Sequence, residues 1–229
     1  MTSKEKILGR IRAQKGRGPV KREHADILEK RIQEHARNIV PERGQKPLSE
    51  QVDLFRSKLE ALMATVEEVE KEADIPACIQ AYLKQHNLPS RLKMSPSEEV
   101  SGLSWSDIPT LEVVTGAGSE EDMVGVSPAF AGIAETGTLM MASGAETPST
   151  VNFLPENHIA ILKMSRMKGS YEEAWDSLRE AMGDKGMPRT VNLISGPSRT
   201  ADIEQRLIMG AHGPKRLYVI LVADGSETD

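Results

Sequence analysis

Hydrophobic residues in the first half of the chain recur at steps of three and four, the spacing that predicts amphipathic helices. Near the N-terminus, Ile7, Leu8 and Ile11 share one helical face. After a break at residues 16–19, a second set recurs in the same way at Ala25, Leu28, Ile32, Ala36 and Ile39. We expect two helices whose apolar stripes need a surface to cover, on the main domain, a second copy of the chain or another protein.

A segment without apolar periodicity separates these helices from the next pattern. Residues 41–47 contain two prolines and a glycine, so we expect a linker there. The apolar residues that follow are spaced alternately three and four positions apart, which predicts one long helix. They are Val52, Phe55, Leu59, Leu62, Val66 and Val69. Ser49 is its expected N-cap, because a serine hydroxyl accepts a hydrogen bond from an unpaired first-turn N–H.

Another helix is expected to begin at Asp74-Ile75-Pro76, because proline is tolerated in the first turn of a helix. It should end near residues 87–89. Its apolar side carries Cys78, which we therefore expect to pack in the core rather than to act as a reactive thiol.

From Arg91 onward the pattern changes to short apolar runs of strand length, divided by glycine, proline and serine. These runs are residues 111–115, 123–126, 138–142, 158–163, 191–194 and 217–222. One helix is expected over 170–182, and a shorter one after Thr200. Continuous apolar strands that alternate with helices predict the α/β class, with a mainly parallel sheet flanked by helices.

Charge divides the chain at the expected linker. The first 46 residues carry 13 basic and 6 acidic side chains, a net charge of +7, whereas the remainder carries 16 and 28, a net charge of -12. We therefore expect a basic helical arm with its linker over residues 1–46 and an α/β domain over 47–229. The overall charge of -5 argues against a general nucleic-acid binder.

The remaining composition narrows the cellular setting. Lys4, Lys6 and Arg10 interrupt any apolar signal core, and no apolar run is long enough to span a bilayer. A single cysteine excludes a disulfide within the chain and any cluster or zinc site that needs several thiolates from it. We expect a cytoplasmic protein without a cofactor or metal of its own.

Three loops offer candidate chemistry. One is the turn at residues 116–119, the second carries Glu135 among small residues, and the third spans 195–202. Because ligands of open α/β sheets bind at the carboxyl ends of strands, we expect the first and third loops to lie there. In the third loop, Ser198 or Thr200 is expected to cap the following helix, whose N-terminal end favours an anion, and Arg199 adds a guanidinium that matches a carboxylate or phosphate.

The expected site follows from these loops. Glu135 is the candidate catalytic carboxylate, since a positioned carboxylate can serve as a nucleophile. The candidate ligand-binding residues are Thr136, Gly137, Thr138, Ser195, Gly196, Ser198, Arg199, Thr200, Asp202 and His212. Neither His158 nor His212 stands in a metal-binding pattern, and we expect His158 to be structural.

Four motifs resemble the lactate utilisation protein C family, a LUD-domain family, and occur in its order. They are Gly-Ile-Ala-Glu-Thr-Gly-Thr from Gly132, Leu-Pro-Glu-Asn-His-Ile-Ala from Leu154, Ser-Gly-Pro-Ser-Arg-Thr-Ala-Asp-Ile-Glu from Ser195 and Gly-Ala-His-Gly-Pro from Gly210. The resemblance implies a fold like that of the ribose-phosphate isomerase, CoA-transferase and formyltetrahydrofolate cyclo-ligase group. It also implies a part in oxidising L-lactate to pyruvate together with two iron–sulfur proteins.

Three roles are compatible with this resemblance. In the first, the chain is the non-cluster subunit of the lactate-oxidising assembly, where Arg199 holds the carboxylate of a small organic anion and Glu135, Thr136 and Thr138 orient its hydroxyl. In the second, the chain is a free-standing acyl- or CoA-transferase that uses Glu135. In the third, it is a scaffold whose basic arm docks on an acidic partner. Homo-oligomers are compatible with all three.

Overall fold

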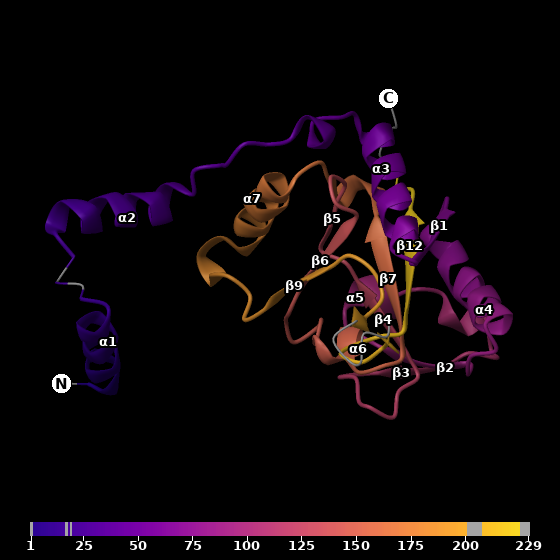
Figure 1. The fold of residues 1–229 in the computed structure, drawn as a ribbon. Coiled ribbons are helices and arrows are strands. Elements are labelled where there is room, and N and C mark those ends of the chain that lie inside the picture. The colour runs from indigo at the N-terminus through magenta and orange to yellow at the C-terminus, as the bar shows by residue number, and fades with distance from the viewer. Residues whose placement is uncertain (1, 17, 19, 201–207, 225–229) are drawn as a thin grey trace. The chain divides into compact units, whose positions relative to one another are not determined.

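The computed structural model describes residues 2–16, 18, 20–200 and 208–224, which belong to two compact units, residues 1–39 and 40–229 (Figure 1). The first unit contains the two predicted helices, α1 (Ser3–Gln14) and α2 (Arg22–Glu34), but α2 ends before Ala36 and Ile39 of the predicted stripe. Thr2 and Glu5 form a capping box at the start of α1. Neither helix buries a described residue, so the stripe of α1 and its counterpart on α2 are exposed.

The second unit is the α/β domain. Its helices are α3 (Leu48–Ala61), α4 (Ile75–Gln85), α5 (Glu98–Ser101), α6 (Thr150–Phe153) and α7 (Tyr171–Met182). Its strands are β1 (Thr65–Val69), β2 (Arg91–Met94), β3 (Glu112–Thr115), β4 (Val124–Pro128), β5 (Ala131–Ile133), β6 (Thr138–Ala142), β7 (Asn157–Lys163), β8 (Met167–Lys168), β9 (Val191–Ile194), β10 (Arg199–Thr200), β11 (Ile208–Met209) and β12 (Arg216–Val222). Short 3-10 turns include Glu42–Gly44 and Met164–Arg166.

Six strands form one sheet in the order β1-β12-β7-β4-β2-β3, and every neighbouring pair is parallel. The predicted α/β class with a mainly parallel sheet is therefore confirmed. Strands β4, β7 and β12 are buried along nearly all of their length, which explains their continuous apolar sequences.

A smaller sheet has the order β8-β5-β6-β9. Strands β5 and β6 form an antiparallel hairpin, and β6 also pairs antiparallel with β9. The predicted strands 138–142 and 191–194 thus exist, but they lie in this sheet and not in the parallel one. The hairpin turn explains the difference, because Gly137 at φ +64° lets the chain reverse within four residues after β5.

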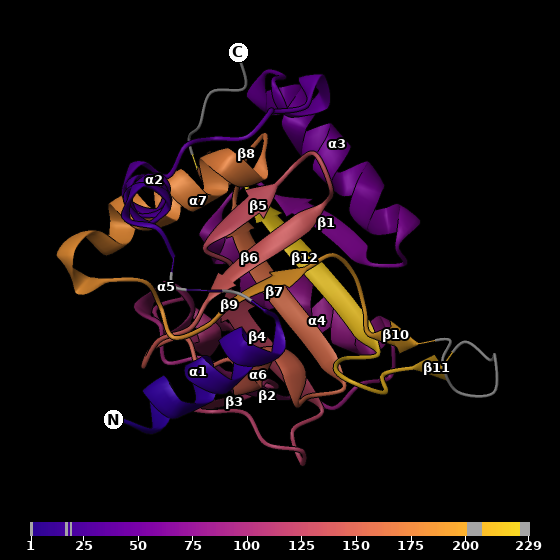
Figure 2. The same ribbon diagram turned by 60° about the vertical axis from the view of Figure 1, so that its left-hand side comes forward.

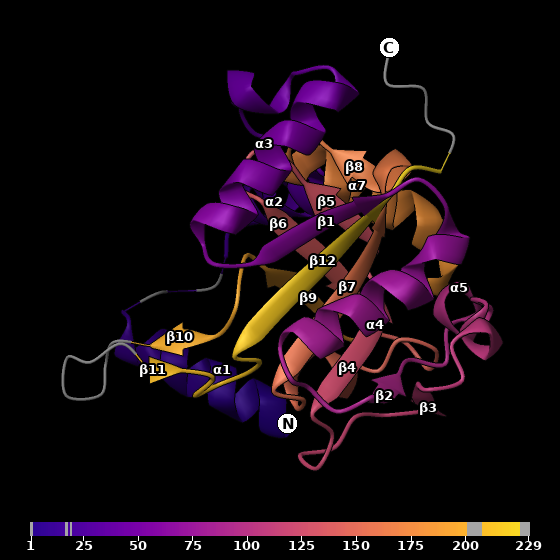
Figure 3. The ribbon, with the colours of Figure 1, turned by 90° about the vertical axis from the view of Figure 1, so that its right-hand side faces the viewer.

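Helices and the small sheet cover the two faces of the parallel sheet (Figures 2 and 3). On one face, α4 packs Ile79 and Leu83 against β7 and β12 side chains such as Ile161 and Ile220. On the other face, α3 and the small sheet form a second core. Helix α7 then packs on the far side of the small sheet. The parallel sheet is therefore enclosed on both faces.

The predicted helix over residues 52–69 is wrong in its second half. Helix α3 ends at Ala61, and Met63 adopts a left-handed φ of +69° before β1 begins at Thr65. In β1, Val66 and Val69 contribute to the cores on opposite faces of the sheet, whereas a helix would have placed them on one face. Ser49 is not the N-cap either, since α3 begins at Leu48 with Pro47 in the capping position.

Cys78 lies in the core, as its position on the apolar side of α4 predicted. Its thiol lies 2.8 Å from the hydroxyl of Tyr218, which in turn donates a 2.5 Å hydrogen bond to Glu67. Burial raises the pKa of the Cys78 thiol to about 11. The thiol is therefore protonated at neutral pH.

Residues 41–47, expected as a linker, pack on the α/β domain. Gly44 is buried and lies against Gly169, just before α7. A Cβ atom added at Gly169 would lie 1.7 Å from the carbonyl oxygen of Gly44, a distance that the backbones cannot tolerate. This contact fixes the segment before α3 against the turn before α7.

We predict that Gly169→Ala lowers the free energy of unfolding of the α/β unit by about 1–3 kcal/mol, because overpacked sites force backbone shifts. Urea unfolding of the variant and the wild type measures the difference. Gly9→Ala is the control, since its added methyl group meets no atom within 4 Å. Equal stabilities of wild type and Gly169→Ala would show that the segment around Gly44 does not pack as described.

Candidate functional site

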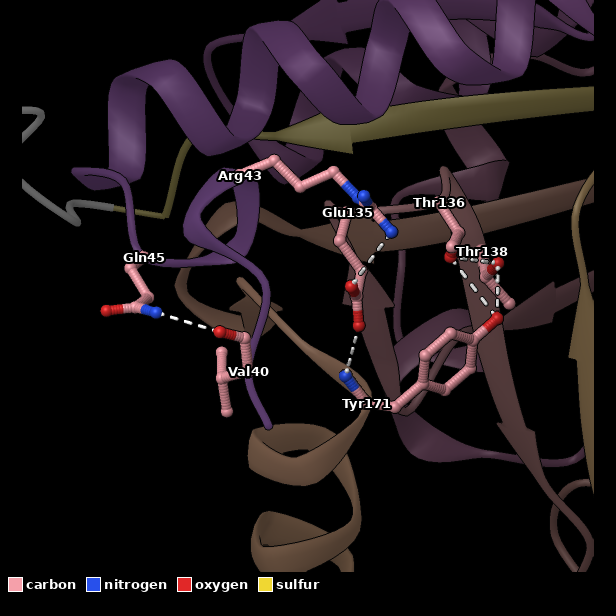
Figure 4. Close-up of polar contacts among 7 residues, drawn as sticks. All are labelled: Val40, Arg43, Gln45, Glu135, Thr136, Thr138 and Tyr171. Atoms are coloured by element: carbon pink, nitrogen blue, oxygen red, sulfur yellow. Dashed lines mark hydrogen bonds and ion pairs between the residues drawn. The ribbon is translucent and has the colours of Figure 1, made fainter. Parts of the chain in front are cut away.

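Glu135 lies in the β5–β6 hairpin and is 5% exposed. Its Oε1 accepts a 3.0 Å hydrogen bond from the backbone N–H of Tyr171, the first residue of α7, and its Oε2 lies 3.6 Å from the guanidinium of Arg43 (Figure 4). A carboxylate at a helix N-terminus is stabilised by the helix dipole. Both carboxylate oxygens thus have partners within the domain, and the catalytic role of Glu135 stays a prediction.

Four hydroxyl groups meet beside Glu135. The Oγ1 atoms of Thr136 and Thr138 are 2.7 Å apart, and both lie within 3.2 Å of the hydroxyl of Tyr171 (Figure 4). Thr138 Oγ1 also lies 2.6 Å from Ser195 Oγ. Hydrogen bonds between hydroxyl groups therefore join the second and third predicted loops. Gly137 lies in the hairpin turn, where its positive φ allows the chain to reverse.

We expected the third loop at the carboxyl edge of the parallel sheet, and this prediction is wrong. It follows β9, which belongs to the small sheet, and it lies near the amino ends of β7 and β12. Arg199 and Thr200 form strand β10, which pairs antiparallel with β11. The helix predicted after Thr200 and the candidate residue Asp202 lie outside the described residues.

A small cavity of about 200 Å³ lies beneath the third loop, and we call it the amino-end pocket. It brings together predicted site residues from two distant segments of the chain. These are Ser195, Gly196, Ser198 and His212. Three hydrogen bonds hold the segments together: Ser198 N–H donates to the Pro214 carbonyl (2.8 Å), Gly210 N–H donates to the Ser198 carbonyl (2.8 Å), and His212 N–H donates to Ser198 Oγ (3.2 Å). Glu135, Thr136, Thr138 and Arg199 do not line the pocket, although Thr138 reaches it through Ser195.

His158, which we expected to be structural, also lines the amino-end pocket. It is the second residue of β7 and is 1% exposed. Its Nε2 lies 2.8 Å from Ser127 Oγ, and that hydroxyl donates to Asn152 Oδ1 at 2.8 Å. Because the single hydroxyl hydrogen of Ser127 is used, Nε2 carries the imidazole hydrogen and Nδ1 is an acceptor.

Nδ1 of His158 has no hydrogen-bond partner among the described residues. Burial lowers the pKa of His158 to about 4, so the ring is neutral at physiological pH. A buried acceptor without a partner loses its hydrogen bond to water on folding. An O–H or N–H group that reached Nδ1 would restore this hydrogen bond.

The described lining of the pocket combines apolar side chains with a few polar groups and contains no Lys or Arg. Gly196 and Gly213 belong to this lining, and their backbone N–H groups donate to no other described residue. Both glycines have positive φ angles, a conformation that residues with side chains rarely adopt. These two N–H groups are donors without a described partner, whereas Arg199 lies outside the described lining of the pocket.

The first predicted loop is occupied by structural contacts. Gly118 N–H donates to Thr150 Oγ1 at 3.0 Å, and Ser119 donates to Asp122 through both its N–H and its hydroxyl. Across residues 2–16, 18, 20–200 and 208–224, no group of three or more His, Cys, Asp or Glu side chains is placed to hold a metal ion. Within the same residues, no helix has the length and apolarity needed to cross a bilayer.

Comparisons with known proteins agree with the fold. The LUD domain family model matches residues 52–222. A crystal structure of a DUF162 family protein from Deinococcus radiodurans is 19% identical, with a TM-score of 0.57, and the likeness covers 78% of this chain and 99% of that one. At this identity the likeness concerns the fold alone.

Curated relatives match over part of their length. An uncharacterized protein from Neisseria meningitidis is 43% identical over 98 residues, which is 43% of this chain and 41% of that protein. Lactate utilization protein C of Bacillus subtilis is 35% identical over 107 residues, 46% of this chain and 45% of that protein. The chain thus spans about half the length of the curated relatives that it matches.

We predict that His158 makes stability fall in acid. Its pKa is about 4 in the folded chain and 6.5 in the unfolded one, so the unfolded state takes up a proton first as the pH falls. The free energy of unfolding begins to fall near pH 6.5 and stops falling near pH 4, and the total decrease is about 3 kcal/mol. Denaturant unfolding between pH 7 and pH 4 measures it.

His158→Gln removes this titrating group and should flatten the pH dependence, whatever its effect on stability at pH 7. His24→Gln, at an exposed position of α2, is the control and should leave the profile as in wild type. Parallel profiles for wild type and His158→Gln would contradict a buried, neutral imidazole.

Proposed function

This chain belongs to the LUD domain family, and we propose that it acts in lactate utilisation as the non-cluster subunit of an iron–sulfur system that oxidises L-lactate to pyruvate. Relatives from several bacteria carry the name lactate utilization protein C, which supports the pathway. In this role the chain binds a small 2-hydroxy acid in the amino-end pocket and works in the cytoplasm.

His158 carries the proposal. A 2-hydroxy acid has a hydroxyl group that needs an acceptor, and Nδ1 of His158 is a buried acceptor without a partner in the described structure. A neutral imidazole accepts this hydrogen bond, whereas a protonated one would repel the hydroxyl hydrogen. The low pKa of His158 thus keeps the acceptor available at the pH of the cytoplasm.

The other end of the ligand, its carboxylate, is assigned to the glycine-lined side of the pocket. The free N–H groups of Gly196 and Gly213, together with the hydroxyl of Ser198, supply donors for an anion. The pocket volume of about 200 Å³ is smaller than the roughly 300–1,000 Å³ typical of sites for larger organic ligands, so it fits a three-carbon acid.

The electrons from lactate oxidation are assigned to partner proteins. The one thiol of the chain, Cys78, is buried and protonated, and it cannot by itself ligate an iron–sulfur cluster. The two electrons released on oxidation of lactate pass in this proposal to clusters held by other subunits. The chain itself holds and orients the substrate.

The transferase alternative has less support. A covalent nucleophile must be reached by an acyl group, but the Glu135 carboxylate is 5% exposed and is engaged by Arg43 and the start of α7. The scaffold alternative rests on the exposed apolar stripes of α1 and α2. It concerns residues 1–39 and is separable from ligand binding.

We predict that L-lactate binds more tightly than pyruvate, because pyruvate has a carbonyl where Nδ1 of His158 needs a donor. One neutral hydrogen bond is worth about 1 kcal/mol, a roughly fivefold preference. Isothermal titration calorimetry at pH 7 measures both affinities. His158→Gln should abolish the preference, because an amide both donates and accepts, whereas His24→Gln should retain it.

Ser198→Ala gives a second, independent measure, since it removes a hydroxyl from the carboxylate side and should weaken both acids equally. Absence of binding by either acid to the wild type at millimolar concentration would sink the ligand assignment. An equal affinity for lactate and pyruvate would show that the pocket binds the carboxylate but that His158 does not accept a hydrogen bond from the lactate hydroxyl.

We predict that deletion of residues 1–39 leaves lactate affinity unchanged but reduces electron transfer in the system reconstituted with its iron–sulfur subunits. The deletion ends at residue 39 because Arg43 and Gly44 pack on the α/β domain. Lactate-dependent cluster reduction, followed by absorbance, is the measurement. Unchanged reduction would show that the arm does not serve assembly.

A further inference from the structure

The order of the strands reverses between β2 and β4, which are neighbours in the parallel sheet. From β2 the chain continues outward to the edge strand β3, whereas from β4 it continues in the opposite direction to β7 and β12. The two connections lie on opposite faces. Val100 of the β2–β3 connection packs in the α4 core, while Leu139 of the β4–β7 connection packs in the α3 core. In open α/β sheets, ligands bind beyond the carboxyl ends of strands at such a reversal.

A cavity of about 700 Å³ lies at this position, and we call it the switch-point cavity. Its lining includes Ser97 after β2, Pro128 at the end of β4 and Arg166 in the turn after β7. The amino-end pocket lies at the opposite end of β7. The volume falls in the range of about 300–1,000 Å³ that is common for organic ligands larger than lactate.

An ion pair spans the strand ends in the cavity wall. Glu99 Oε2 lies 2.9 Å from Arg166 Nη1, which also donates a 3.2 Å hydrogen bond to the carbonyl of Ala129, directly after β4. The Glu99 side chain is 17% exposed, and its Oε1 is buried without a hydrogen-bond partner among the described residues. An unpaired carboxylate oxygen removed from water is costly, so a donor from a ligand would stabilise it.

The rest of the lining adds further constraints on the ligand. The structure shows the Nε and Nη2 groups of Arg166 donating to no described residue, so the guanidinium offers donors beside the Glu99 acceptor. Phe130 and Met182 supply apolar surface, and Lys185 supplies an ammonium group. Together they match a molecule with an N–H donor next to a carbonyl, a planar apolar body and an anionic group.

We propose that the switch-point cavity binds a mononucleotide whose heterocycle carries an N–H beside a carbonyl, the edge shared by guanine, uracil and flavin. The N–H donates to the Glu99 carboxylate, and the carbonyl accepts from the Arg166 guanidinium. The ring packs on Phe130 and Met182, and the phosphate pairs with Lys185. This site is separate from the amino-end pocket and stands independently of lactate binding.

Calorimetric titration of the full chain with GMP, UMP and FMN tests the proposal, and AMP is the ligand control because its ring edge lacks the N–H beside a carbonyl. At least one of the three should bind with Kd below about 1 mM, and AMP should bind at least tenfold more weakly. The three arms identify which heterocycle the cavity prefers.

Glu99→Gln should weaken the preferred nucleotide at least about tenfold, because hydrogen bonds to charged groups are the stronger ones. Glu98→Gln is the matched control, since Glu98 is an exposed residue of the same short helix and lies outside the cavity lining. Arg166→Lys keeps the charge but loses the planar guanidinium, and it should weaken binding as well.

Three results would overturn the proposal. They are a Kd above about 1 mM for all three nucleotides, equal binding of AMP, and an unchanged affinity in both Glu99→Gln and Arg166→Lys. Thermal unfolding of each variant accompanies the titrations, so that a loss of binding is read only from variants that fold as the wild type does.

Discussion

The parallel pairing of β12 between β1 and β7 is the interaction on which the rest of this domain depends. Strand β12 is the last described element of the chain, yet it lies between β1, the first strand, and β7, a central strand. Leu217 to Val222 are all buried, so the strand contributes to the cores on both faces of the sheet. The parallel sheet is complete only when the two ends of the α/β unit have met.

The same pairing builds the amino-end pocket. In the β7–β12 register His158 lies opposite Leu217, and the segment before β12 brings His212 and Gly213 over the start of β7. Burial at this position, rather than a neighbouring charge, makes His158 a neutral acceptor. The chemistry proposed for the pocket is thus a consequence of how deeply β7 lies in the sheet.

The hairpin motif around Glu135 has a different part in the molecule. Its carboxylate joins three segments, the turn before α3, the hairpin itself and the start of α7. The hydroxyl cluster of Thr136, Thr138 and Tyr171 continues this connection to Ser195 in the lining of the amino-end pocket. Small residues and a buried acid at this position hold the third loop in place.

The sequence by itself determined most of the local elements, because helix and strand spacing and the proline in α4 act between residues close in the chain. It also determined the α/β class and the family. Only the tertiary structure decided that β6 and β9 leave the parallel sheet, that residues 65–69 form a strand, and that His158 lines a pocket while Arg199 does not. These outcomes depend on pairings between residues far apart in the chain, such as Thr65 with Tyr218, for which the spacing of apolar residues carries no signal.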